Sequence, residues 1–154
     1  MIDPSSLSQA RSRAIKYLSI REHASLELRN KLKHKGFEEK VIASVLSELK
    51  AKKLLSDERF AESYVRSRTQ KGFGPLRIQQ ELRERGITRD VLTEALDSND
   101  SAVWVAHASH VRQKRFGADL PKGQNELGKQ VRFLQYRGFT PSQIKGAFLN
   151  ESKV

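Results

Sequence analysis

The chain has 154 residues and a formal net charge of +11, from 29 Lys and Arg against 18 Asp and Glu. It contains no cysteine, which excludes disulfides, thiolate metal sites and a thiol nucleophile. It has no apolar run near the roughly 18 residues of a membrane span, and residues 1–6 lack the order of a signal peptide. We therefore expect a soluble, cytoplasmic protein without a membrane partner. The charge favours a polyanionic partner, although a basic surface can also serve solubility alone.

Helical patterns dominate the chain, and strand patterns are nearly absent. Amphipathic helices are predicted, in chain order, over residues 7–20, 60–68 and 103–116. A similar segment follows each of them. It has a leucine four residues before a glycine, an apolar residue directly after the glycine, and apolar residues six and ten after it. The three glycines are Gly36, Gly86 and Gly138.

These glycines are 50 and 52 residues apart (86 − 36 and 138 − 86), a period typical of repeat proteins. Each fits the position after a helix where the backbone turns left-handed. A further helix then begins, indicated by Thr88 in one repeat and by a capping box at 140–143 in another. We predict an all-α protein of nine helices in three tandem three-helix repeats, stacked into an elongated, curved array. The repeats are residues 1–55, 56–97 and 98–154.

The stretch K-G-F-G-P-L-R-I-Q-Q-E-L at residues 71–82 resembles the central signature of the RecX family. L-S-D-E-R-F-A at 55–61 is also similar to the family, as are E-L-R-N-K-L at 27–32 and F-L-Q-Y-R-G-F at 133–139. The resemblance spans about residues 14–150. In one departure, Ala24 stands where the family usually has a capping serine, so Ser25 is expected to cap that helix in a shifted register.

The resemblance implies a regulator, mainly an inhibitor, of the RecA recombinase. Relatives bind the RecA filament on single-stranded DNA and limit its extension, ATP hydrolysis, strand exchange and coprotease activity, and so modulate DNA repair, recombination and the SOS response. The implied partners are the RecA filament and single-stranded DNA, with double-stranded DNA as a further candidate, and a monomer is expected.

Two other classes of function compete with this interpretation. One is a sequence-nonspecific helical DNA-binding protein without a RecA partner, although the helix predicted at 88–96 carries Asp90 and Glu94, which repel phosphate. The other is an enzyme, which we do not expect, since the sequence contains no nucleotide loop, no Ser-His-Asp set and no paired carboxylates of defined geometry. No cofactor and no metal are expected, because His107 and His110 lack nearby further ligands.

Lys and Arg side chains of the second and third repeats are the candidates for contacting DNA or the filament, because Arg binds phosphate and carboxylate bidentately. The alternative is a solvated face in which they pair with Glu81 and Glu84. The candidates are Arg66, Arg68, Lys71, Arg77, Arg83, Arg85, Arg112, Lys114, Arg115, Lys129, Arg132 and Arg137.

The loop at residues 72–75 can be interpreted as a phosphate cradle before a helix, but a simple turn is the stronger prediction. Phe73 is expected in the core against Tyr64 or Leu76, with base stacking as the alternative. Helical spacing likewise predicts core positions for Trp104, Phe133 and Tyr136.

Overall fold

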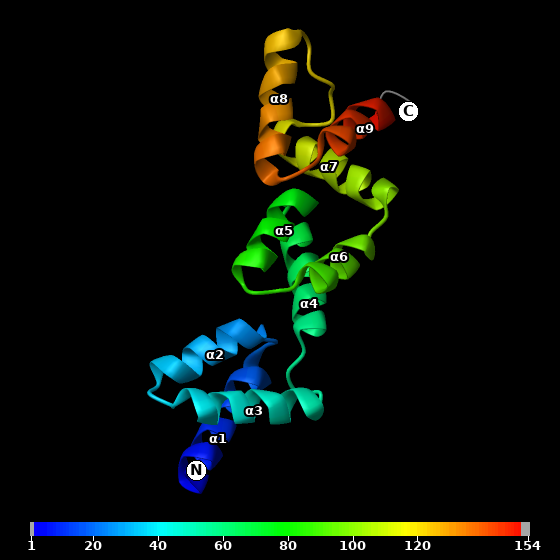
Figure 1. The fold of residues 1–154 in the computed structure, drawn as a ribbon. Helices are drawn as coiled ribbons and strands as arrows, with labels where there is room; N and C mark the ends of the chain where they lie inside the picture. The colour runs from blue at the N-terminus through cyan, green and yellow to red at the C-terminus, as the bar shows by residue number, and fades with distance from the viewer. Residues whose placement is uncertain (1, 152–154) are drawn as a thin grey trace. The chain divides into compact units, whose positions relative to one another are not determined.

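The computed structural model describes residues 2–151, and within this range the chain forms nine α-helices and no strand (Figure 1). The all-α prediction is confirmed. No helix in this part of the chain combines the length and the apolar character that crossing a bilayer requires. The helices are α1 (Pro4–Ile20), α2 (Ser25–His34), α3 (Glu39–Ala51), α4 (Asp57–Gln70), α5 (Pro75–Glu84), α6 (Arg89–Asp97), α7 (Ser101–Phe116), α8 (Gln124–Arg137) and α9 (Pro141–Glu151).

The three repeat glycines end α2, α5 and α8 in the same way. Their φ angles are +95°, +78° and +99°, in the left-handed region where a Cβ atom is penalised. The amide of the next residue then donates to the carbonyl five residues back, as Phe139 does to Leu134 at 3.2 Å. The following helix starts three residues after each glycine. The predicted junction is confirmed.

Two helix starts show how the caps are built. At α9, Thr140 Oγ1 accepts from the amide of Gln143 at 3.1 Å, and the Gln143 side chain accepts from the Thr140 amide at 3.0 Å, which confirms the predicted capping box. At α2 the shifted cap is wrong. Ser25 is the first helical residue, its hydroxyl has no hydrogen-bond partner within residues 2–151, and its amide donates to the Asp57 carboxylate at 2.7 Å.

The described residues group into two compact units. Unit 1 is residues 2–63 with 82–92, and unit 2 is residues 64–81 with 93–151. Helices of the predicted middle repeat contribute to both units. The division into repeats at 55 and 97, and the curved stacking of the repeats, therefore remain predictions.

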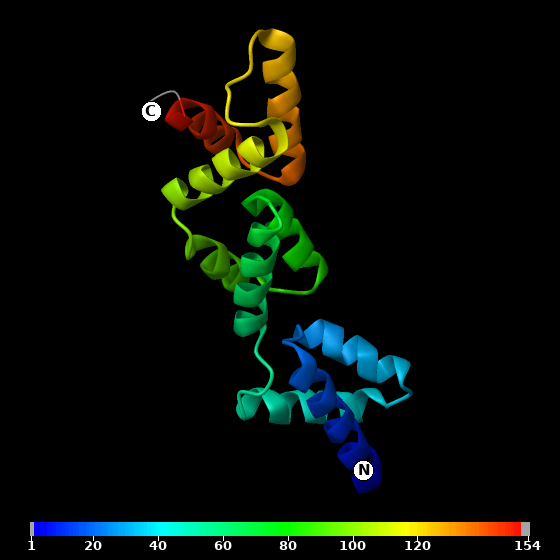
Figure 2. The same cartoon turned by 180° about the vertical axis from the view of Figure 1, so that it is seen from behind.

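Each unit has its own hydrophobic core. In unit 1, α1, α2 and α3 pack together around Leu28, Leu32 and Ile42, all fully buried. In unit 2, α7 lies against both α8 and α9 (Figures 1 and 2), and Leu134 and Ala147 are fully buried.

Candidate functional site

Aromatic rings and guanidinium groups alternate on the surface of unit 2, in what we call the basic-aromatic cluster. Phe73 lies beneath three guanidinium carbons, those of Arg68, Arg77 and Arg137, at 3.9, 4.3 and 5.0 Å from its ring centroid. The Arg137 guanidinium is also 5.0 Å from the Phe133 ring. Phe73 is thus half-buried under cations, and its predicted packing in the core is wrong.

The cluster continues along α7 and α8. The rings of Phe116 and Phe133 meet edge to face at 5.3 Å. Arg115 lies over both rings, at 5.2 and 5.9 Å, and the Lys129 ammonium is 6.0 Å from the Phe116 centroid. Stacking on a ring orients a guanidinium without neutralising its charge.

One carboxylate neutralises part of this cluster. Glu81 accepts two hydrogen bonds from Arg68, at 2.8 and 2.9 Å, one from Tyr64 at 2.9 Å and one from Arg77 at 3.4 Å. Burial raises the pKa of Glu81, but the hydrogen bonds from Arg68 and Tyr64 outweigh it, and the net pKa is lowered. Arg68 and Arg77 are therefore engaged within the fold. The pairing with Glu81 agrees with the alternative interpretation, but the side chains of Arg68 and Glu81 are only 19% and 17% exposed, so this pair does not form a solvated face.

A pocket of about 290 Å³, which we call the cationic pocket, is lined by four cations and by no acidic side chain. The cations are Lys71, Lys114, Arg115 and Arg137. Within residues 2–151, none of these four forms an ion pair with an Asp or Glu. The pocket is bounded by the end of α4, by α7 and by α8. Its lining comprises Thr69, Gln70, Lys71, Gly72, His107, His110, Val111, Lys114, Arg115, Phe133 and Arg137.

Arg112 is a correction to the predicted site. Its side chain is 0% exposed, and it donates to the Gln130 side-chain oxygen at 3.1 Å and to the carbonyl oxygens of Ala118 and Asp119 at 3.4 and 3.3 Å. A buried cation remains charged only where such acceptors surround it. Arg112 therefore fastens α7 to the following loop and to α8, and it is not available to DNA or to a partner.

The remaining candidates are exposed and lie on separate elements. Arg66 is on α4, and Arg132 is on α8 beside the basic-aromatic cluster. Arg83 and Arg85 lie at the end of α5 and just beyond it, and they belong to unit 1, whereas the other candidates belong to unit 2. Their role stays a prediction.

The three aromatic residues predicted in the core differ in burial. Trp104 is 4% exposed, which confirms its core position. Phe133 is half-buried within the basic-aromatic cluster. Tyr136 is 78% exposed, so its predicted burial is wrong. Its ring lies 5.7 Å from the guanidinium of Arg77, and it therefore extends the cluster toward solvent.

The glycine-rich loop before α5 docks on the end of α8. The amides of Gly74 and Leu76 donate to the carbonyls of Arg137 and Gly138, at 2.8 and 2.9 Å. A Cβ atom on Gly74 would lie 2.5 Å from the backbone of Gly138. These amides already have acceptors, so a phosphate cradle is excluded at them and the turn is confirmed. The docking itself was not predicted from the sequence.

The two histidines of α7 line the cationic pocket but form no metal site with other residues. No group of three His, Asp or Glu side chains that could hold a metal occurs in the part of the chain that the structure describes. Burial lowers the pKa of His107, and the neighbouring His110 lowers it further. His107 therefore adds no charge to the pocket at neutral pH.

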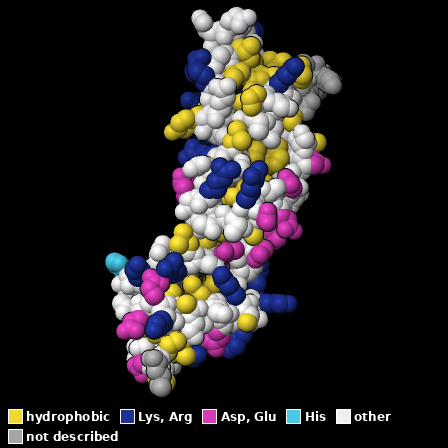
Figure 3. Space-filling view, viewed as in Figure 1, with side chains coloured by type: hydrophobic (Ala, Val, Ile, Leu, Met, Phe, Trp, Pro, Cys, Tyr) yellow, Lys and Arg dark blue, Asp and Glu magenta, His cyan; other side chains and the backbone are white. Residues whose placement is uncertain are grey.

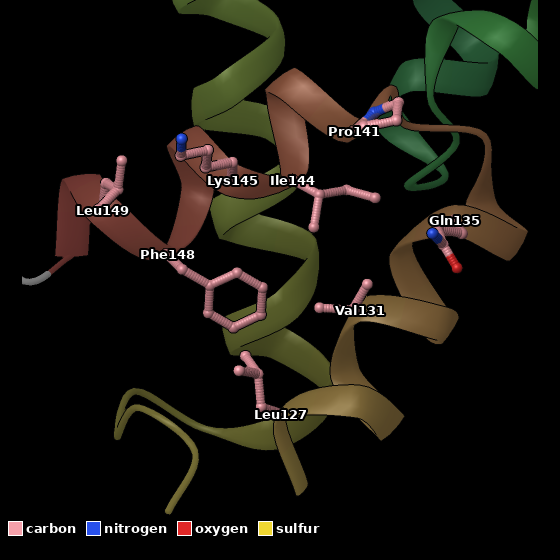
Figure 4. Close-up of a pocket in the computed structure, with 8 residues that line it drawn as sticks. All are labelled: Leu127, Val131, Gln135, Pro141, Ile144, Lys145, Phe148 and Leu149. Atoms are coloured by element: carbon pink, nitrogen blue, oxygen red, sulfur yellow. The ribbon is translucent and has the colours of Figure 1, made fainter. Parts of the chain in front are cut away.

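A second hollow in unit 2 is apolar. It has a volume of about 350 Å³, and we call it the apolar groove. Figure 4 shows Leu127 and Val131 of α8 facing Phe148 and Ile144 of α9. Hydrophobic side chains gather over α8 and α9 on the face that Figure 3 shows. The complete lining is Leu127, Val131, Gln135, Pro141, Ile144, Lys145, Phe148 and Leu149.

Comparison among the repeats indicates that this groove is specific to the third. Seven residues before the repeat glycine stands Val131, where the first two repeats have Arg29 and Gln79. In the first repeat Arg29 pairs with Glu39 at 2.9 Å, and Glu39 occupies the place of Pro141. A solvated ion pair is thus replaced by an apolar surface. Alignment of the three repeats on their glycines identifies these residues, whereas the pattern of charged residues does not.

Three family models match the chain. They describe the first, second and third three-helix domains of RecX and cover residues 10–49, 56–96 and 105–148. The resemblance inferred from the motifs is confirmed, and so are the three three-helix repeats.

Individual relatives agree with this match. Regulatory protein RecX of Halorhodospira halophila is 44% identical over 138 residues, covering 89% of this chain and 84% of the relative. Regulatory protein RecX of Legionella pneumophila is 37% identical over 142 residues, covering 92% and 94%. The crystal structure of RecX from Lactobacillus salivarius shares the fold, with a TM-score of 0.86, 23% identity and coverage of 97% and 99%.

Proposed function

The chain belongs to the RecX family, and we propose that it regulates the RecA recombinase by binding the RecA filament on single-stranded DNA and limiting its extension. Lower ATP hydrolysis, strand exchange and coprotease activity follow from a shorter filament. In this proposal the protein acts in the cytoplasm, as a monomer, through binding and without catalysis of its own.

The observation that carries the DNA-binding part is the unpaired charge of the cationic pocket beside stacked phenylalanine rings. Lys71, Lys114 and Arg115 have no acidic partner within residues 2–151, and Phe133 and Phe116 lie beside them. Single-stranded DNA is bound by grooves that combine cations for the phosphates with rings on which bases stack. A double helix offers no free base faces, so the cluster suits single strands better.

The apolar groove supplies a contact of a different kind, to RecA itself. Its lining includes Leu127, which is 37% exposed, and Leu149, which is 51% exposed. Exposed apolar patches are typical of protein interfaces. Phosphate has no affinity for such a surface. In this proposal the apolar groove therefore contacts RecA and the cationic pocket contacts DNA.

The proposal is tested by following RecA ATP hydrolysis on circular single-stranded DNA while this protein is added. We expect inhibition with far fewer molecules of this protein than of RecA. Inhibition only at amounts that saturate the DNA would support the alternative, a nonspecific DNA-binding protein that competes for the strand. No inhibition at any amount would refute regulation of RecA.

Two variants separate the contacts. Arg115→Glu should weaken binding to single-stranded DNA and reduce the dependence of log K on log salt concentration by about 1. Val131→Arg installs the residue of the first repeat in the apolar groove. It should leave DNA binding unchanged and abolish inhibition by small amounts of protein. The matched control for Arg115→Glu is Lys40→Glu. It is the same charge reversal at an exposed position in the first turn of α3, where an acidic residue is tolerated.

A further inference from the structure

The cationic pocket holds more positive charge than its surroundings in the fold require. Its four cations are near the ends of three helices: Lys71 follows α4, Lys114 and Arg115 lie in the last turn of α7, and Arg137 ends α8. A helix C-terminus carries roughly −0.5 of an elementary charge. Three such ends together carry roughly −1.5 and offset that part of the +4 carried by the four cations. An excess of about +2.5 remains and faces the pocket.

The size and the donors of the pocket point to a small, highly charged anion. A volume of about 290 Å³ is at the lower limit of ligand sites, which suits one phosphate with an adjoining sugar or base. The guanidinium of Arg137 is held between the rings of Phe73 and Phe133 and donates to the Lys71 carbonyl at 3.2 Å. Held guanidinium groups bind phosphate oxygens with little loss of side-chain freedom.

A hydroxyl group in the pocket wall supplies independent support. Thr69 lines the pocket and is 8% exposed, and its Oγ1 has no hydrogen-bond partner among the residues that the structure describes. A buried hydroxyl without a partner is unfavourable, and native proteins rarely leave one. A phosphate oxygen in the pocket is an acceptor that this hydroxyl lacks.

We propose that the cationic pocket binds a phosphomonoester dianion, the terminal phosphate of a DNA strand or of a mononucleotide. A phosphodiester within a strand carries one negative charge. A terminal phosphate carries roughly −1.5 to −2 at neutral pH, which matches the excess of the pocket more closely. The inference rests on the proposed function, because the pocket is part of the surface proposed to bind DNA.

The test compares the binding of one short single-stranded oligonucleotide prepared with a terminal phosphate or with hydroxyl groups at both ends, using the full chain and fluorescence anisotropy. We expect the phosphorylated strand to bind about tenfold more tightly. Inorganic phosphate and a deoxynucleoside monophosphate are added as competitors. Competition by both would identify a free nucleotide as a ligand in its own right, and preference without such competition would identify a strand end. Both results support the site.

Variants locate the effect. Lys71→Gln and Lys114→Gln change exposed side chains of the pocket and should remove the preference for the phosphorylated strand. The control Lys129→Gln removes a cation of the basic-aromatic cluster outside the pocket. It should weaken both strands equally and leave the preference intact.

The inference and the proposed function fail in different ways. Equal binding of the two strands, weakened to the same extent by substitution of Lys71 or Lys114, would overturn the phosphomonoester site and leave DNA binding standing. Failure to bind either strand, together with unchanged RecA activity, would overturn the proposed function. Loss of preference in the Lys129 variant alone would place the site elsewhere and would also overturn the inference.

Discussion

The contact between the glycine-rich loop and the end of α8 predicts an unusual cost for Gly138→Ala. A Cβ atom on Gly138 would lie 2.5 Å from the Arg77 Cβ and 2.7 Å from the Arg77 nitrogen. Relief of this overlap requires the loop to move, which breaks the hydrogen bonds from Gly74 and Leu76. The positive φ costs about 1 kcal/mol, and the overlap with the two lost bonds adds about 3 kcal/mol. We expect unit 2 to lose about 4 kcal/mol of unfolding free energy.

Gly36→Ala is the matched control, because it has the same place in the first repeat and a φ of +95°, with no atom within 4 Å of the added Cβ. It should cost unit 1 only about 1 kcal/mol. Native-state hydrogen exchange measures both units in one sample, on peptides from α8 and from α2. Gly74→Ala should reproduce the larger loss, and the double variant should cost less than the sum. Equal losses for Gly138→Ala and Gly36→Ala would refute the docking argument.

Three further predictions concern ionisable groups. Arg112→Met should lower the stability of unit 2 by about 3 kcal/mol in urea unfolding followed by Trp104 fluorescence, because Gln130 and two carbonyls lose their donor; an unchanged midpoint would contradict this. The pKa of Glu81 is lowered, so the stability that its charged form adds to unit 2 is present above about pH 4.5 and is lost as the pH falls through the folded pKa. Glu81→Gln should remove this pH dependence of stability in the same assay. Burial lowers the pKa of His23, so unit 1 should be most stable above pH 6.5 and weaken as the pH falls through the folded value, which hydrogen exchange on α2 measures; persistence of the effect in His23→Gln would assign it elsewhere.

The helices and their junctions could be predicted because the buried positions recur. Leu32, Leu82 and Leu134 each stand four residues before a repeat glycine, and each is fully buried. A recurring apolar position together with a glycine defines both a helix face and its end, so one pattern predicted three junctions. The starts of helices were less accurate. The helix predicted from residue 7 begins at Pro4, because the Asp3 carboxylate accepts from the Ser5 amide.

The candidate site was harder to predict, because the sequence does not show which cations are neutralised. Arg68 is 13 residues from Glu81 and lies on another helix, so only the fold brings them within 2.8 Å. Arg112 stands four residues after the buried Ala108, on the inner face of α7, and this spacing was a signal that it is not at the surface. Composition therefore predicts a class of partner, and the fold distinguishes cations engaged within the structure, such as Arg68 and Arg112, from those that are not.

Divergence among the repeats explains why both proposed contacts lie in unit 2. The core positions are alike in the three repeats because each has to bury the same helix faces. Exposed positions are released from that constraint, so a difference there needs another cause. Eleven residues after its glycine the third repeat has Leu149, where the first two repeats have Ser47 and Asp97. At the position of Val131 the first repeat has Arg29, which forms an ion pair. Exposing apolar side chains at such positions costs solubility unless a partner covers them. The third repeat therefore departs from the others where a bound protein would compensate for that cost, and the cationic pocket lies on the same α8 helix.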